Sequence, residues 1–469
     1  MKKIRFRTLL GAGFIFLFSL NISLITAGLI SNLTWFIVAA IILSAGQMVL
    51  HNLFRRKHSI LRYYPFRYKL KHLSGKISPF LSKSFFGDDS LRRVVSSKQY
   101  ELILNRAKNI PGDIVRNTLT HPDDPDFECL RYIDNRKAVE PKVTDLKVTI
   151  GTPQCRQPYS LSILTIGALN QKLLSNASIL ALSEGANIQA CAVNTGQGGI
   201  SPYLIRGGSD LIWQLSHEDY AFRKEDSSFN EKLFQVTATR PYVKMIELVL
   251  PRHEVNIMKR LAGDRMISFL NRLRTLSEGK PIGIRLFNPG RDVINGICKS
   301  MLSARIYLDF ITIDGTVSAD GPDSFSISKA SLRGYFEALT YSRKTIDSYG
   351  LPTKILASGL LVSEYDILRS VALGANACYC TTPMVLAIGS NSRFRSNEAM
   401  NQRVRVANFH RNTIEATVKL MELCGYQSLD QVKPADFYRK TDFFKVKSLK
   451  EIYFDEHPVR EAHLFSGLS

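Results

Sequence analysis

Small and polar residues recur where short apolar runs of this chain end, and these are the positions at which a ligand could be held. Glycine lets the backbone of a loop approach a bound group, and free N–H groups opening a helix favour an anion. The breaks that follow apolar runs are Gly167-Ala168-Leu169, Asn194–Gly199, Asn288-Pro289-Gly290, Asp314-Gly315, Ser358-Gly359 and Thr381-Thr382. The last two are small enough to admit a phosphate, although simple strand-to-helix turns would use the same residues.

The segments that position these loops alternate between short β-branched runs and stretches of helical periodicity. Runs this short and apolar are typical of a parallel sheet buried on both faces. The candidate strands are Ile163–Ile166, Ala190–Val193, Tyr220–Phe222, Val243–Leu248, Ile282–Leu286, Phe310–Asp314, Lys354–Ala357 and Ala377–Cys380, of which the third is faint. Eight such units over ~240 residues predict an α/β fold of the (β/α)8 TIM barrel class, with reactive groups at the carboxyl ends of the strands.

The last helix is predicted from the recurrence of Ala407, Ile414, Val418 and Met421 on one face. Gly425 follows where a helix C-cap is expected.

Cysteine and histidine residues give weaker signals for chemistry. Cys155 has no histidine near it in the sequence, which favours a structural thiol. Cys378 and Cys380 would share one face of a strand; this admits a metal pair, but two buried thiols are the simpler interpretation, and we expect no metal. The run His217-Glu218-Asp219 could transfer protons or form a solvated loop, and we favour the loop.

The N-terminal part of the chain has a charge pattern of its own. Its first 87 residues hold thirteen Lys and Arg and no Asp or Glu, so they carry 13 of the +21 net charge. Between Thr8 and Phe54 only the weakly basic His51 interrupts an uncharged stretch. As a helix this stretch would extend roughly 70 Å, against about 30 Å of bilayer core. The length predicts two transmembrane spans, near Thr8–Ile30 and Leu33–Phe54, whereas a cleaved signal peptide would have a shorter apolar part.

Basic residues flank both ends of this transmembrane hairpin, which predicts that both ends face the cytoplasm. The expected location is the cytoplasmic (inner) membrane, with the rest of the protein in a reducing compartment. Seven cysteines without disulfide spacing agree with that compartment. The predicted organisation is a hairpin over 1–54, a basic juxtamembrane segment and connector over 55–145, a barrel over 146–400, and a C-terminal helix and tail over 401–469. No nucleic-acid partner and no dinucleotide motif are indicated.

Several motifs, taken in order, are similar to the FMN-binding domain of the glutamate synthase family and of its membrane-attached, glutamate-synthase-like branch. The similarity is carried by Ile163–Leu169 with Asn194–Tyr203, by Asp309–Gly315, and by Ile355–Gly359 followed by Ala372–Ala377. Arg56–Arg62 and Phe409–Thr413, the latter opening the last helix, are similar to segments of the membrane-attached branch. The order and spacing of the motifs are more specific than any one of them.

The resemblance implies an FMN-dependent oxidoreductase in which reduced FMN delivers a hydride to 2-iminoglutarate, formed from 2-oxoglutarate and ammonia. It places Ile166, Gly167, Ala168 and Leu169 behind the flavin ring, Asn194, Thr195 and Gly196 at its edge, and Ser358, Gly359, Ala375 and Asn376 at the phosphate. It places a small-molecule substrate near Gln197, Gly198, Gly199 and Asp314. The catalytic residues and the electron donor stay unassigned, and the source of ammonia would be free ammonia or a partner.

Three regions depart from the family pattern. Relatives carry three cysteines for an iron–sulfur cluster after the eighth strand, whereas Ala387–Arg395 contains none, so we expect no cluster, because thiolate ligands are required. A glycine-rich loop with a lysine is replaced by Val249–Glu254; Lys244, Arg252 or Lys259 could substitute for that lysine. A glycine-threonine-glycine run is replaced by Thr316–Asp320, and Gln197 stands where the family motif has an acid.

Two functions therefore stay open from the sequence. The first is a glutamate-synthase-like FMN-dependent oxidoreductase attached to the membrane, which the kept turns favour. The second is a catalytically degenerate barrel that acts as a membrane-attached binding or scaffolding protein, which the altered loops favour.

Overall fold

The structure, a computed structural model, divides into two compact units, residues 1–84 and 85–469. It describes residues 95–120, 124, 127–131, 146–169, 171, 174–196, 199–215, 229–250, 263–315, 329–389, 399–442 and 445–455, together with Ser23, Thr26, Trp35, Ala40, Leu43 and Ser44. The predicted spans at Thr8–Ile30 and Leu33–Phe54 lie outside the described residues, apart from those six. Within the described part of the chain, no helix is long and apolar enough to cross a bilayer.

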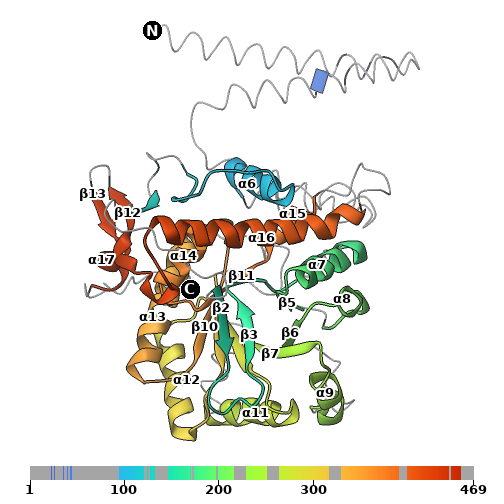
Figure 1. Cartoon of the computed structure of the whole chain (residues 1–469), viewed down its shortest axis with the longest axis vertical. Helices are drawn as coiled ribbons and strands as arrows, with labels where there is room; N and C mark the ends of the chain where they lie inside the picture. The colour runs from blue at the N-terminus through green and yellow to red at the C-terminus, as the bar shows by residue number, and fades with distance from the viewer. Residues whose placement is uncertain are drawn as a thin grey trace. The chain divides into compact units, whose positions relative to one another are not determined.

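A closed barrel of eight parallel strands forms the centre of the second unit and confirms the predicted α/β barrel (Figure 1). Pairing of β11 with β4, which sets Cys378 opposite Leu164, closes the ring. The strands are β4 (Leu164–Ile166), β5 (Val193–Asn194), β6 (Leu211–Leu215), β7 (Val243–Leu250), β8 (Ile282–Phe287), β9 (Phe310–Asp314), β10 (Lys354–Ser358) and β11 (Ala377–Cys380).

The third barrel strand, β6, lies earlier in the chain than predicted. The prediction of Tyr220–Phe222 is wrong, because β6 at Leu211–Leu215 pairs with both β5 and β7. Two large side chains, Trp213 and Gln214, interrupt the β-branched pattern there. Trp213 stacks on Phe234 of the following helix, with 5.4 Å between ring centroids, so its side chain packs in the apolar layer between the strands and the helices.

Helices follow the strands and cover the outside of the barrel (Figure 1). They are α7 (Asn176–Ile188), α8 (Pro202–Gly207), α9 (Glu231–Ala238), α11 (Gly263–Leu276), α12 (Arg291–Ala304), α13 (Lys329–Ser348), α14 (Glu364–Ala372), α15 (Thr382–Ile388) and α16 (Ala399–Leu423). The long helix α16 contacts α7, so the end of the barrel sequence packs against its beginning.

The predicted C-terminal helix is confirmed as α16, with Ala407 and Met421 buried and Gly425 at a φ of 68° beyond its end. It begins at Ala399, so Phe409–Thr413 lies inside the helix and does not open it. His410 is buried there, with Nε2 2.9 Å from the Leu164 carbonyl oxygen of β4. Burial lowers the pKa of His410 to about 4, so its neutral ring donates this hydrogen bond.

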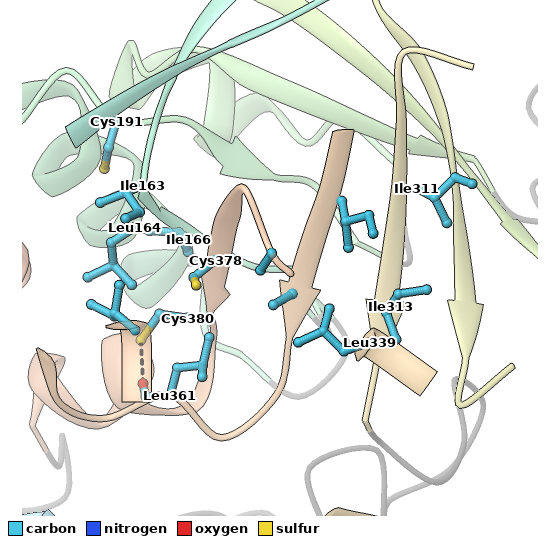
Figure 2. Close-up of a cluster of buried hydrophobic side chains, with 14 of the residues drawn as sticks. Ile163, Leu164, Ile166, Cys191, Ile311, Ile313, Leu339, Leu361, Cys378 and Cys380 are labelled. Atoms are coloured by element: carbon cyan, nitrogen blue, oxygen red, sulfur yellow. Dashed lines mark hydrogen bonds between the residues drawn. The ribbon is translucent and has the colours of Figure 1, made fainter. Parts of the chain in front are cut away.

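An apolar layer fills the space between the strands and the helices, and Figure 2 shows part of it. Cys378 and Cys380 both lie in this layer, beside Ile163 and Leu164, which confirms them as buried thiols. The Sγ atom of Cys380 donates to the Leu361 carbonyl oxygen at 3.2 Å. Burial raises the pKa of Cys378 to about 12, so the thiol is not ionised at neutral pH.

A β-hairpin, β2 (Lys147–Ile150) and β3 (Tyr159–Ser162), closes the N-terminal end of the barrel. It contributes Ile150 and Leu161 to an apolar cluster inside the barrel. The barrel strands supply the rest of that cluster, which includes Ala192, Ile212, Met245, Phe310, Leu356 and Ala377. This half of the lumen is therefore filled by side chains and cannot hold a ligand.

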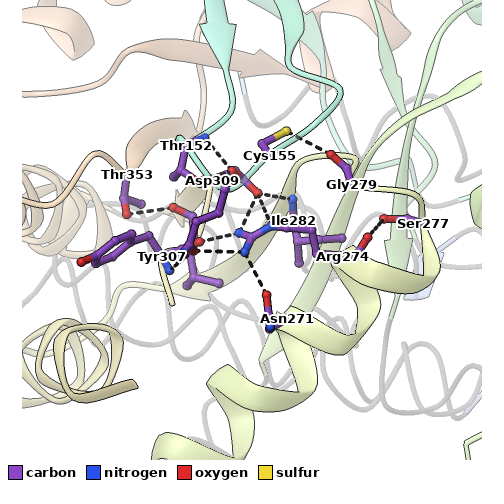
Figure 3. A network of polar contacts seen from close by, with 12 residues as sticks. Thr152, Cys155, Asn271, Arg274, Ser277, Gly279, Ile282, Tyr307, Asp309 and Thr353 are labelled. Carbon is purple, nitrogen blue, oxygen red and sulfur yellow. Dashed lines mark hydrogen bonds and ion pairs between the residues drawn. The ribbon is translucent and has the colours of Figure 1, made fainter. Parts of the chain in front are cut away.

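A buried carboxylate, Asp309, ties the hairpin to the strands around it (Figure 3). Its Oδ1 accepts from the Thr152 backbone N–H at 2.6 Å and from the Thr152 hydroxyl at 2.8 Å. Its Oδ2 accepts from Arg274 Nη2 at 2.9 Å and from the Ile282 N–H at 2.8 Å. One side chain thus joins the hairpin, α11, β8 and β9.

The stretch expected to be a connector contains ordered elements packed on the barrel. These are α6 (Ser97–Ala107) and β1 (Glu128–Leu130), and β1 forms a small sheet with β12 (Phe437–Asp442) and β13 (Lys445–Ser448), followed by α17 (Leu449–Tyr453). Glu128 binds Arg369 of α14 at 2.7 Å and Arg439 of β12 at 2.6 Å. Burial alone would raise the pKa of Glu128, but the two guanidinium groups lower it below its ordinary value.

Replacement of Asp309 tests this anchor. Asp309→Asn leaves Arg274 buried without a counter-charge, so we expect a loss of about 3–5 kcal/mol in the free energy of unfolding, measured by urea denaturation. Asp347→Asn removes the carboxylate of an exposed ion pair with Arg343 and should cost less than about 0.5 kcal/mol. Equal losses in the two variants would contradict the role given to Asp309.

Candidate functional site

The half of the lumen towards the carboxyl ends of the strands is polar. Side chains of a strand point alternately to its two faces, so the residue two positions after an inward apolar residue also points inward. Two positions beyond the apolar cluster, two beyond Gly283 in β8, and again at the end of β9, the strands carry Asn194, Gln214, Glu247, Arg285, Thr312, Asp314, Ser358 and Tyr379. All eight are buried, and we call them the lumen polar layer.

Arg285 of β8 is the centre of the lumen polar layer. Its Nε donates to Glu247 Oε2 on β7 at 2.9 Å, and its Nη1 forms an ion pair with Asp314 on β9. Nη1 also lies 3.2 Å from Ser358 Oγ on β10. The guanidinium carbon stands 5.1 Å from the centroid of the Tyr379 ring on β11. One side chain therefore contacts four other strands.

Glu247 and Asp314 each accept from further groups. Glu247 accepts from Asn194 Nδ2 at 2.8 Å and from the Thr312 hydroxyl at 2.6 Å. Asp314 accepts from the Ser358 hydroxyl at 3.0 Å. Burial alone would lower the pKa of Arg285, but Glu247 and Asp314 raise it above its ordinary value, so the guanidinium stays charged.

Two buried polar atoms of this layer, Gln214 Oε1 and Arg285 Nη2, have no hydrogen-bond partner, and Tyr379 Oη lies beside Asn194 and Thr312 without a hydrogen bond of regular geometry. Unsatisfied polar atoms in a protein interior cost free energy, so their presence together indicates a place for a polar ligand. Burial raises the pKa of Tyr379 well above its ordinary value, which keeps its hydroxyl a neutral donor. Two donors and one acceptor are thus available in the same half of the lumen.

The glycine turns that the sequence analysis assigned to the flavin lie against each other. A Cβ atom on Gly167 would stand 2.2 Å from Thr381 Oγ1, and one on Gly196 would stand 2.0 Å from the Leu169 carbonyl oxygen. Gly196 also has a φ of 61°, which favours glycine. Close packing between the loops that follow β4, β5 and β11 therefore explains both glycines without a ligand.

Other side chains predicted to bind the cofactor are used within the protein. Asn194 donates to Glu247 and its Oδ1 accepts from the Gly196 N–H at 3.0 Å, while the Thr195 hydroxyl accepts from the Gln214 N–H at 3.0 Å. Ile166 and Leu169 are buried in the outer apolar layer, with Ala168 between Gly167 and Leu169 on the same loop.

The residues predicted at the phosphate are not brought together. Ser358 ends β10 and Gly359 follows it, and the Ser358 hydroxyl donates to Asp314 in the lumen polar layer. Ala375 and Asn376 precede β11, at the opposite end of the barrel, where Asn376 Oδ1 accepts from the Ile355 N–H at 2.8 Å. Ala375 and Asn376 therefore cannot border the same phosphate as Ser358. Thr381 and Thr382, which follow β11, lie at the same end as Gly359.

Two of the residues predicted at the substrate, Gln197 and Gly198, lie outside the described residues. Gly199 has open space around its Cα, and its carbonyl oxygen accepts from Gln171 Nε2 at 2.7 Å. Asp314 is the one predicted substrate residue that belongs to the lumen polar layer.

The altered loops are described only in part. The segments 216–228, 251–262, 316–328 and 390–398 lie outside the described residues, and they include His217–Asp219, Arg252, Lys259 and most of the departure from the cysteine pattern. Lys244 is described: it is the second residue of β7 and pairs with Asp210, at 3.6 Å, at the N-terminal end of the barrel. It is therefore too far along the strand to replace a lysine at the mouth.

Thiol chemistry and metal binding find no support in the described ranges. The Sγ atom of Cys155 contacts the Gly279 carbonyl oxygen at 3.2 Å, and burial raises its pKa to about 11. Nowhere in those ranges are three or more His, Cys, Asp or Glu side chains grouped to hold a metal ion.

Gln214, Glu247, Arg285 and Tyr379 were not predicted as site residues, because they lie within the strands and not in the loops that follow them. The sequence holds a signal for two of them: a charged side chain stands within an apolar run in Ile246-Glu247-Leu248 and in Ile284-Arg285-Leu286.

Two substitutions in the lumen polar layer should differ in their effects on stability. Arg285→Met leaves Glu247 and Asp314 without a guanidinium, so we expect a loss of about 3–5 kcal/mol in the free energy of unfolding. Tyr379→Phe removes a hydroxyl that makes no hydrogen bond of regular geometry and should cost less than about 0.5 kcal/mol. Urea denaturation of both variants checks this; a large loss in Tyr379→Phe would mean that its hydroxyl is paired.

Comparisons with known proteins agree with the resemblance noted in the sequence. Residues 230–396 match the family described as "Conserved region in glutamate synthase". The chain is 24% identical over 406 residues to the glutamate synthase large subunit-like protein YerD of Bacillus subtilis (strain 168), covering 71% of this chain and 77% of that protein. Among solved structures, a mandelate oxidase variant with (S)-mandelic acid has a TM-score of 0.46 and 13% identity over 76% of this chain and 97% of its own. A flavocytochrome b2 variant has a TM-score of 0.45 and 13% identity over 80% and 86%. The barrel from α9 to the end of β11, where Glu247, Arg285 and Asp314 lie, is thus glutamate synthase-like in sequence.

Proposed function

We propose that this chain is a glutamate-synthase-like, FMN-dependent oxidoreductase acting on a 2-imino acid, which is 2-iminoglutarate by resemblance. The observation that carries the proposal is the lumen polar layer, in which Arg285 and Tyr379 keep donors for a ligand in the glutamate synthase-like region. When bound, reduced FMN would supply a hydride to the imino carbon, and a proton carried by the imino nitrogen would complete the amino group.

The residues of the lumen fit a ligand with carbonyl or carboxylate oxygens. Arg285 Nη2 and the Tyr379 hydroxyl can each donate to such an oxygen, and Gln214 Oε1 can accept from an N–H. A flavin ring and an α-imino carboxylate both present these groups. Glu247 and Asp314 hold the guanidinium of Arg285 on two sides, so its remaining N–H groups are fixed in direction before a ligand binds.

The phosphate of FMN would lie at the loops after β10 and β11, as in other barrels of this class. Gly359 supports this place, because its backbone is open to the approach of a ligand: a Cβ atom there would have only the Tyr335 ring near it, at 3.4 Å. The N-terminus of α14 is a poorer place, because its free N–H groups are capped by Ser363 and its first turn carries Glu364 and Asp366. We therefore assign the phosphate to Gly359, Thr381 and Thr382.

A second function is favoured by a separate observation. The side chains of Asn194, Thr195 and Ser358, which the resemblance assigns to the cofactor, are hydrogen-bonded within the protein. In a barrel without flavin chemistry that acts as a binding or scaffolding protein, these side chains would serve only the internal hydrogen bonds that they already make.

Flavin content separates the two functions. Purified in detergent, the chain should be yellow and release FMN on denaturation. Gly359→Ala should fold and retain less FMN, because its methyl group blocks the approach of a phosphate to the backbone. Gly290→Ala, in the open loop after β8, is the matched control and should retain FMN. Gly167 is unsuitable for this test, because any side chain there would collide with Thr381.

A colourless protein that takes up no added FMN would favour the scaffold. If FMN is present, anaerobic addition of 2-oxoglutarate and ammonium to the chemically reduced protein should reoxidise the flavin and form glutamate. Reoxidation without glutamate would leave the flavin enzyme in place but contradict this substrate.

We also propose that segments Thr8–Ile30 and Leu33–Phe54 attach the enzyme to the inner membrane, with the barrel in the cytoplasm. The support is the length of the uncharged stretch and its basic flanks. The electron donor would then be an external partner at the membrane surface.

Alkaline extraction of membranes tests the attachment. The full chain should stay in the membrane pellet. Leu20→Arg with Leu43→Arg puts a charge near the centre of each span, at about 2.5–3.5 kcal/mol each, and should release part of the protein. Complete release of the unmodified chain would contradict two membrane spans.

A further inference from the structure

A groove lies on the outside of the barrel, apart from the lumen. It is bounded by α12, α13, β12 and α17, and its volume is about 350 Å³. That volume is at the lower end of the range of small-molecule sites, which is roughly 300–1,000 Å³. The groove therefore has the size for a small metabolite.

The charged side chains that line the groove are mainly basic. They are Arg291, Lys344 and Arg439, with Glu337 as the one acid among the lining residues. Arg439 is already paired with the buried carboxylate of Glu128. The other two basic residues have no carboxylate partner within the described part of the chain.

Arg291 and Lys344 are instead held by neutral groups. The guanidinium of Arg291, the first residue of α12, lies over the Tyr341 ring at 5.1 Å from its centroid. The Nζ of Lys344 donates to the carbonyl oxygens of Tyr453, at 3.2 Å, and Phe454, at 3.0 Å. Both cations keep further N–H groups for a ligand, because an ammonium has three donors and a guanidinium five.

Two buried hydroxyl groups line the same groove. Thr340 is 2% exposed, and its Oγ1 has no hydrogen-bond partner. The Tyr453 hydroxyl lies beside Arg439, and burial raises the pKa of Tyr453, so it stays protonated and can donate to a ligand. A buried hydroxyl without a partner is uncommon in folded proteins, so Thr340 marks a place where a ligand oxygen could bind.

We propose that this groove binds a small organic anion through a carboxylate or phosphate group held by Arg291 and Lys344, with Thr340 and Tyr453 as hydroxyl donors. The proposal is independent of flavin binding in the lumen. Because Lys344 joins α13 to α17, a bound anion would connect a barrel helix to the C-terminal elements.

Thermal unfolding of the full chain in detergent, at constant ionic strength, tests this site with inorganic phosphate and citrate as probes and chloride as the reference. We expect at least one probe to raise the unfolding midpoint saturably. In Arg291→Gln/Lys344→Gln the apparent Kd should rise about tenfold or more, because two charge-assisted hydrogen bonds are lost. Thr340→Val, which keeps the shape of the side chain, should weaken the same probe to a smaller degree.

The matched control is Arg343→Gln, which removes a neighbouring cation that is paired with Asp347 and does not line the groove. It should keep the probe affinity of the unmodified chain, as should Arg291→Lys/Lys344→Arg, which keeps both charges. The proposal is overturned if neither probe raises the midpoint above chloride, or if the shift is the same in Arg291→Gln/Lys344→Gln as in Arg343→Gln. A saturable shift by phosphate alone or by citrate alone identifies which oxyanion the groove accepts.

Discussion

A guanidinium in the lumen of a closed barrel has to be paired, because no solvent reaches it and an isolated buried charge is costly. Arg285 meets this constraint through Glu247 on β7 and Asp314 on β9, the strands on either side of its own. The other polar side chains of the lumen arrange themselves around these three. Asn194 and Thr312 satisfy Glu247, and Ser358 satisfies Asp314.

The same constraint divides the barrel into two halves. Below the polar layer, the hairpin β2–β3 and the inward apolar residues fill the lumen, and Asp309 fixes the hairpin to the surrounding strands. Within the polar layer, which lies in the half of the lumen towards the ends where the loops leave the strands, Gln214 and Arg285 carry buried atoms without a hydrogen-bond partner. The filled half gives the rigidity that a preorganised site requires, and the polar half supplies the groups that a ligand could contact.

The outer shell uses the same kind of interaction at the surface of the barrel. Glu128 and Glu364, both buried, take guanidinium groups from Arg369, Arg439 and Arg106. These contacts fasten α6, β1 and the C-terminal sheet to α14, so segments on both sides of the barrel sequence complete one compact unit. The C-terminal elements β12 and α17 form one side of the external groove.

The sequence by itself determined the barrel, because seven of its eight strands are short apolar runs and the residues that end them are small or polar. It also determined the last helix, whose apolar face repeats at helical spacing. It could not place β6, because Trp213 and Gln214 point to opposite faces of this strand and interrupt the β-branched pattern that marks the others. Only the tertiary structure decided which polar residues meet: Glu247, Arg285, Asp314 and Tyr379 are distant in sequence and converge because ring closure turns alternate positions of every strand to one axis. The tertiary structure also decided that Asn376 and Ser358 do not share a site. The order of the motifs had placed both at the phosphate, but Ser358 ends β10 and Asn376 precedes the parallel strand β11, so they lie at opposite ends of the barrel.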